Sequence, residues 1–162
     1  MKLKLSSIQL LETHFIKVSI QALPGEHSGE CRGLVKLEMK AEMEKPTKDS
    51  PNVWTILFSL SAEGDENCNR HAYNVESEAI GRIYCKADVE SPESLEFIGK
   101  SGSSLVYGAI REMLANISAR SVRSTFYLPT LDLSHIDVEV RPENFRQDRR
   151  SDYQDAQNDS SV

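Results

Sequence analysis

The sequence predicts an α+β fold, in which a four-stranded antiparallel sheet has one face covered by a long C-terminal helix and a short helix. Three observations predict it. Apolar and charged residues alternate strictly at 35–44, two further segments at 53–60 and 73–85 have strand-like composition, and apolar residues recur at helical spacing after position 90. Consecutive strands followed by helices are typical of α+β domains.

The four predicted strands differ in how regularly their side chains alternate. The first occupies at least the second half of 2–22. The second, 35–44, is the clearest, because a strand places all its apolar residues on one face and its charged residues on the other. The third is 53–60. The fourth is 73–85 and contains Gly81, which predicts a bulge or a bend.

Two helices are predicted after the strands. Ser91 followed by Pro92 is a helix-start signal, because Ser is a favoured N-cap and Pro fits the first helical position. We expect this short helix to end around 99–102 and the main helix to begin at Ser103 or Ser104. The apolar stripe of the main helix consists of Val106, Ile110, Met113, Leu114 and Ile117.

The chain of 162 residues is long enough for one domain, which we place at 1–140. The segment 141–162 is rich in Asp, Arg, Gln, Asn and Ser. So few apolar groups cannot offset an ordering cost of ~1–2 kcal/mol per residue, so a disordered polar tail is predicted.

Charge and composition exclude several classes of protein. With 25 acidic against 19 basic residues the net charge is −6, and a protein that binds duplex nucleic acid needs a basic face, so nucleic acid is not an expected partner. Apolar runs are too short for membrane insertion, and no secretory signal is visible, so we expect a cytoplasmic protein. The three cysteines, Cys31, Cys68 and Cys85, form no CxxC pair, which favours free thiols over disulfides or zinc.

No catalytic, metal or cofactor motif emerges. The four histidines have no metal-ligand spacing, and Gly99-Lys100-Ser101-Gly102 lacks the earlier glycine of a phosphate-binding loop. We therefore expect neither an enzyme nor a cofactor, and keep a small enzyme using Cys85 or His71 as an alternative. Glutamates 38, 42 and 44 share one face of 35–44 with Lys36 and Lys40, which is typical of a solvated face and, less often, of an acidic docking surface.

Apolar residues exceed what one sheet and one helix can bury, so we expect either oligomerisation or an exposed apolar groove. The segment 105–120 has an Arg111-Glu112 pair in its middle and Ser118 with Arg120 near its end, and the apolar Leu128-Pro129 follows. Together with the order of elements, these residues resemble the SecB-type export chaperones and their SecB-like relatives. The chain differs from the export chaperones at 134–142, which is short and strand-like where they continue into a second long helix.

The resemblance implies an ATP-independent holdase that binds unfolded or precursor polypeptides in apolar grooves and assembles as a dimer of dimers, with the export motor ATPase as a further partner. The difference at 134–142 leaves a partner-specific chaperone, for example of an antitoxin, as an alternative. The predicted groove residues are Met39, Met43, Trp54, Phe58, Tyr84, Phe126, Tyr127, Leu128 and Leu131. The helix stripe, from Val106 to Ile117, is the predicted oligomer interface.

Overall fold

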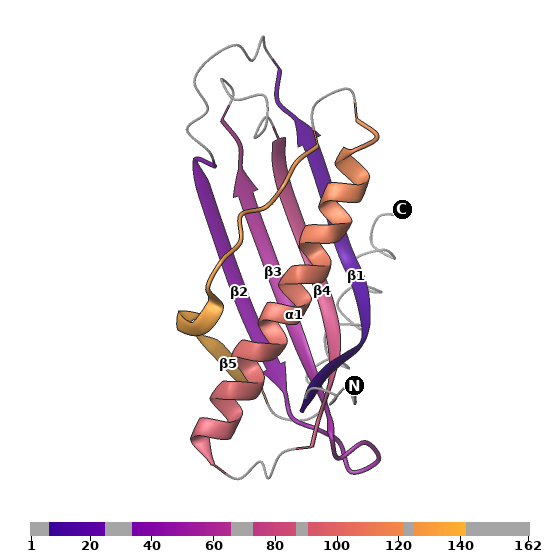
Figure 1. Cartoon of the computed structure of the whole chain (residues 1–162), viewed down its shortest axis with the longest axis vertical. Helices are drawn as coiled ribbons and strands as arrows, with labels where there is room; N and C mark the ends of the chain where they lie inside the picture. The colour runs from indigo at the N-terminus through magenta and orange to yellow at the C-terminus, as the bar shows by residue number, and fades with distance from the viewer. Residues whose placement is uncertain (1–6, 25–33, 66–72, 87–90, 122–124, 142–162) are drawn as a thin grey trace, which may run out of the picture.

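One long helix lies across a five-stranded sheet (Figure 1). The computed structural model describes residues 7–24, 34–65, 73–86, 91–121 and 125–141. The strands are β1 (Ile8–Ala22), β2 (Lys36–Glu44), β3 (Val53–Glu63), β4 (Tyr73–Cys85) and β5 (Val138–Arg141), and the helices are α1 (Pro92–Ser118) and the short 3-10 helix η2 (Leu133–His135). No helix among these residues has the length and apolar character to span a membrane.

The strands are ordered β1-β4-β3-β2-β5 across the sheet. The first four pair antiparallel, as predicted, but the prediction of four strands is wrong, because β5 adds a fifth that runs parallel to β2. After α1 the chain returns along the helix side of the sheet and reaches the outer edge of β2, where Val138 lies opposite Ala41. The α+β class holds, with a mixed sheet.

The sheet has a covered face, which packs on α1, and an open face on the opposite side. On β3 every second side chain from Trp54 to Ala62 is buried on the covered face, and the neighbours between them are half-buried on the open face. Strand β4 extends both sets of side chains. On the covered face Ala79 lies opposite Phe58, and on the open face Ile80 lies opposite Leu57. The core therefore lies between the covered face and α1.

Helix α1 is continuous from Pro92 to Ser118, so the prediction of two helices separated near 99–102 is wrong. The glycines that suggested the break are buried packing positions. A Cβ on Gly99 would lie 3.1 Å from a methyl carbon of Val138, and one on Gly102 would lie 2.9 Å from Ile56. Both glycines let the helix approach the sheet closely. At the N-terminus of the helix, Ser91 is the N-cap, and its side chain accepts a hydrogen bond from the Ser94 N–H at 3.2 Å.

The register irregularities of the described sheet lie in β1 rather than at Gly81. The register of β1 against β4 shifts between Leu10 and Glu12 and again between Phe15 and Lys17. Each shift inserts one residue, Leu11 or Ile16, and restores the inward direction of the following apolar residues. Gly81 keeps a regular register against both neighbouring strands, so the predicted bulge is absent there, and its lack of a side chain lets Val106 pack closely.

A segment that we call the strap, residues 125–137, joins α1 to β5 on the covered side of the sheet (Figure 1). It includes η2, whose N-cap Asp132 accepts from the Ser134 N–H at 2.9 Å. Arg141, the first residue of the predicted tail, is the last residue of β5, and the rest of that tail lies outside the described residues.

Candidate functional site

The strap is held against α1 by hydrogen bonds to its main chain. The Tyr107 hydroxyl donates to the Pro129 carbonyl at 2.6 Å, and Arg111 Nε donates to the Leu128 carbonyl at 2.9 Å. Near the end of the helix, Ser118 Oγ accepts from the Phe126 N–H at 2.8 Å. Three helix side chains thus fix three positions of an extended segment that has no strand partner there.

Side chains alternate along the strap between the core and the surface. Phe126 and Leu128 are buried, and the Phe126 ring contacts Tyr73 edge-on at 5.9 Å between ring centroids. Tyr127, between them, is 59% exposed, and Leu131 is half-buried. The same hydrogen bonds that bury one side of the strap therefore present Tyr127 to solvent.

The residues that carry the resemblance do not come together. Arg111 turns toward the strap, whereas Glu112 and Arg120 are exposed, and no interaction between these three is found in the part of the chain that the structure describes. Ser118 is buried and donates to the Leu114 carbonyl at 2.7 Å. In this protein Arg111 and Ser118 position the strap.

The nine predicted groove residues do not form one surface. Five of them, Met43, Trp54, Phe58, Phe126 and Leu128, are buried in the protomer core because they point from β2, β3 or the strap into the space under α1. Tyr84 is half-buried on the open face. Met39, Tyr127 and Leu131 retain exposed surface on the covered side.

The predicted oligomer-interface residues divide in the same way. Val106, Ile110 and Leu114 are fully buried between α1 and the sheet of their own protomer. Met113 is half-buried and Ile117 is 43% exposed. The helix stripe is thus mainly core in the described protomer, and only its last turn leaves apolar surface.

Other exposed apolar side chains did not figure among the predicted site residues. Leu11 and Ile16 are 52% and 48% exposed at the two bulges of β1, and Phe97 is 53% exposed on the outer side of α1. A signal for the bulges was present, since Leu10-Leu11 and Phe15-Ile16 are adjacent apolar pairs that interrupt the alternation. Phe97 precedes the predicted main helix and had no comparable signal.

Two shallow hollows lie in the surface. One of about 410 Å³ lies between α1 and η2, around Phe97, Lys100 and Leu133, with Glu93 and Asp132 at its rim. The Ser134 main-chain N–H lowers the pKa of the Asp132 carboxyl. The other, of about 290 Å³, lies toward one end of the sheet; small Ser59 and Ser61 line it together with longer charged side chains from neighbouring strands.

Charges on the open face are extensively paired. Glu38 pairs with Lys36 at 2.8 Å, and Glu42, whose side chain is only 6% exposed, pairs with Lys40 at 2.7 Å. Across the sheet Arg82 donates to Glu12 at 2.8 Å, and this hydrogen bond lowers the pKa of the Glu12 carboxyl. Both signs are interspersed here, as on a solvated strand face.

The described residues include no group of three His, Cys, Asp or Glu side chains arranged to hold a metal ion. Cys85 is buried on the covered face, and burial raises the pKa of its thiol, which opposes formation of the nucleophilic thiolate. His71 lies outside the described residues.

Comparison with known proteins places the fold. No family model matches the chain. No curated protein matches it in sequence. Among solved structures, the SecB-like chaperone Rv1957 of Mycobacterium tuberculosis, in complex with a ChAD peptide from the Rv1956 HigA1 antitoxin, matches with a TM-score of 0.56 and 15% identity, over 76% of this chain and 90% of that chain. A protein of unknown function from Streptococcus agalactiae matches with a TM-score of 0.43 and 13% identity, over 76% and 97% of the two chains. The chain has a SecB-like fold.

Proposed function

We propose that this protein is a SecB-like chaperone that binds unfolded polypeptide segments without ATP and holds them extended. The observation that carries this proposal is the fold, because 76% of the chain matches a SecB-like chaperone solved with an antitoxin peptide. The proposal assigns no catalytic role to any residue and needs no cofactor.

We place the client surface on the covered side of the sheet, beside the strap. There Tyr127 is exposed and Leu131, Leu37 and Met39 are partly exposed while also packing against the core. An aromatic side chain and a flexible methionine suit clients of varied sequence, because both offer apolar contact area without demanding one partner shape. The net charge of −6 favours segments that also carry Lys or Arg.

We also propose a homo-oligomer that uses the edge strand β1. Among the described strands β1 has only β4 as a neighbour, so its outer side is the end of the sheet. Leu11 and Ile16 expose apolar surface along it. A second copy would cover both side chains, and a dimer of such dimers is the assembly expected from the resemblance.

Light scattering on a dilution series measures the assembly, and replacing Leu11 and Ile16 by Lys should yield smaller particles.

A second candidate is a chaperone of one partner, such as an antitoxin. The bound peptide of the Mycobacterium tuberculosis chaperone favours it, and so does the burial of five predicted groove residues, which leaves a small apolar surface. Docking on the export motor is the remaining proposal from the resemblance. Direct binding of the purified motor ATPase tests it.

The experiment compares two strap variants. Tyr127→Glu places a charge at an exposed apolar position, and Thr130→Glu places the same charge at an exposed polar position three residues away. Aggregation of a chemically unfolded client is followed by light scattering without nucleotide. We expect the wild type and Thr130→Glu to suppress aggregation and Tyr127→Glu to lose at least fivefold in potency. Equal potency of the two variants would show that the strap is not part of the client surface.

The number of different clients that are protected distinguishes a general holdase from a partner-specific chaperone. A general holdase suppresses aggregation of several unrelated clients at similar molar ratios, whereas a partner-specific chaperone protects one protein and forms a stoichiometric complex with it. A protein that protects no client and binds no unfolded peptide contradicts both.

A further inference from the structure

Strand β5 is the shortest strand of the described sheet and lies at its edge. It has four residues, none of which is buried, and Val140 is 42% exposed. In contrast, alternate side chains of β3 and β4 are buried along nearly their whole length. A short, half-exposed edge strand has few contacts to lose, so it detaches at a lower free-energy cost than the central strands.

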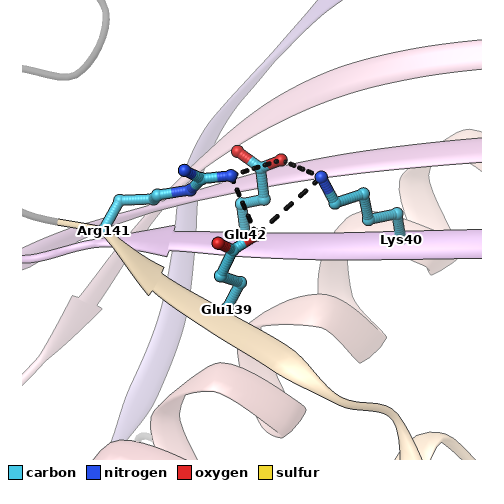
Figure 2. Close-up of polar contacts among 4 residues, drawn as sticks. All are labelled: Lys40, Glu42, Glu139 and Arg141. Atoms are coloured by element: carbon cyan, nitrogen blue, oxygen red, sulfur yellow. Dashed lines mark hydrogen bonds and ion pairs between the residues drawn. The ribbon is translucent and has the colours of Figure 1, made fainter.

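The contacts of β5 separate into an apolar side and a charged side. On the covered face Val138 packs against the space left by Gly99, where a Cβ would lie 3.1 Å from it. On the open face Arg141 reaches Glu42 at 3.5 Å between Nη2 and Oε1, and also pairs with Glu139 at 2.8 Å (Figure 2). Lys40 of β2 also lies 3.8 Å from Glu139, so Val138, Glu139 and Arg141 all supply side-chain contacts that hold the strand in place.

Glu42 of β2 keeps a cation partner if β5 leaves. With β5 in place the carboxylate of Glu42 is almost fully buried, and a buried carboxylate is costly without a cation. Lys40, from the same strand, lies 2.7 Å from it, so the pair survives the departure of Arg141 (Figure 2). The edge of β2 can therefore release one strand and accept another while Glu42 keeps Lys40 as its cation partner.

The edge of β2 is also longer than β5. Strand β2 has nine residues, and β5 pairs only with Ala41 to Glu44. Residues 36–40 have no second neighbouring strand in the described part of the sheet. An extended polypeptide that adds a strand gains main-chain hydrogen bonds along such an edge. A partner strand of about nine residues can therefore make more of these bonds than β5 does.

We propose that the outer edge of β2 binds an extended partner strand parallel to it. Strand β5 occupies this site until a partner strand displaces it. The partner carries the pattern of β5 itself: apolar residues at the positions of Val138 and Val140, directed to the covered side, and a cation at the position of Arg141, directed to Glu42. This inference rests on the proposed polypeptide-binding function and specifies one site and one class of segment.

The test uses the full chain with β5 weakened. The variant Val138→Ser with Arg141→Gln loses the packing at Gly99 and the ion pair to Glu42. The probe is a fluorescent synthetic peptide with the sequence of residues 136–142, and its binding is measured by anisotropy. We expect the variant to bind the peptide at least tenfold more tightly than the wild type. A peptide carrying Arg141→Glu should bind the variant at least fivefold more weakly than the native peptide.

Hydrogen exchange locates the site. In the variant those main-chain N–H groups of 41–44 that face β5 should exchange faster than in the wild type, and the peptide should restore their protection while β3 stays unchanged. If the variant does not fold, Arg141→Gln alone serves in the same measurement. Equal peptide affinity for the wild type and the variant, or protection elsewhere on the chain, overturns the proposal.

Two further outcomes are decisive. A variant that dimerises and binds no peptide shows that the exchanged strand belongs to a second copy, which overturns the choice of partner. The chaperone assay with Tyr127→Glu is independent of this edge. If clients are protected and the peptide does not bind, only the edge proposal fails; if the peptide binds and no client is protected, only the proposed chaperone function fails.

Discussion

Arg111 Nε donates to the main-chain carbonyl of Leu128, 2.9 Å away, and ties the middle of α1 to the strap. One helical turn earlier, Tyr107 does the same for the next carbonyl, that of Pro129. Adjacent carbonyls of a segment without strand partners are thus satisfied by two side chains of one helix face. The consequence is a fixed strap, with Leu128 in the core and Tyr127 at the surface.

Replacing Arg111 by Leu should loosen the strap. The Leu128 carbonyl loses a charged donor, and such hydrogen bonds contribute ~1.5–3 kcal/mol, so we expect the free energy of unfolding to fall by about 1–2 kcal/mol. Urea denaturation measures it. The matched control is Glu112→Gln at the next, exposed position, which should change stability by less than about 0.5 kcal/mol. Equal effects of the two changes would contradict the anchoring role.

Much of the fold follows from local pattern, and the failures have local causes. Strict alternation at 35–44 predicted β2 because one face of that strand is covered and the other carries paired charges. The break predicted at 99–102 was wrong because glycine signals both helix ends and close packing. Only the position of Ile56 and Val138 across the sheet distinguishes them.

Strand β5 and the candidate site depended on contacts that no local pattern contains. The strand-like character of 134–142 was visible, but its pairing with Ala41 is nonlocal and parallel. The sequence pattern does not distinguish an apolar residue of the core from one that lines a groove. Trp54 and Tyr127 were therefore both predicted to contact clients, although Trp54 is buried and Tyr127 is exposed. The role of Arg111 likewise needed the position of the strap.

Gly81 and Val106 should show strong coupling in a double-mutant cycle. A Cβ on Gly81 would lie 2.2 Å from Val106 Cγ2, so Gly81→Ala forces the helix away from β4 and should cost about 1–3 kcal/mol. In a Val106→Ala background the methyl group has space, and the cost of the same change should fall by at least about 1 kcal/mol. Thermal and urea unfolding of the four proteins measure the cycle; additive effects would refute the close contact.

Leu114 should be among the most sensitive positions of α1. It is fully buried, so Leu114→Ala should cost about 2–5 kcal/mol. Leu114→Asp adds an unpaired charge to the core and should prevent folding or assembly. The control Ile117→Ala, at a position 43% exposed in the last turn, should cost much less. A soluble, normally assembled Leu114→Asp protein would contradict the orientation of the helix.

Stability should decline at alkaline pH through Tyr107. Burial raises the pKa of its hydroxyl above the usual value of about 10, against the opposing charge of Arg111. The unfolded chain therefore loses this proton at lower pH than the folded protein, and the stabilisation is lost as pH rises from about 10 through the folded pKa. Urea denaturation between pH 9 and 11.5 should give a shallower decline for Tyr107→Phe than for the wild type. Identical slopes would refute this assignment.

Binding of the purified protein to a library of unrelated 15-residue peptides, without nucleotide, tests the chaperone proposal most directly. We expect binding to extended segments that combine apolar residues with Lys or Arg. A general holdase should bind many of them, and a partner-specific chaperone should bind few. Binding should be lost in Tyr127→Glu and retained in Thr130→Glu. A protein that binds no peptide, or that binds equally in both variants, would contradict a polypeptide-binding function centred on the strap.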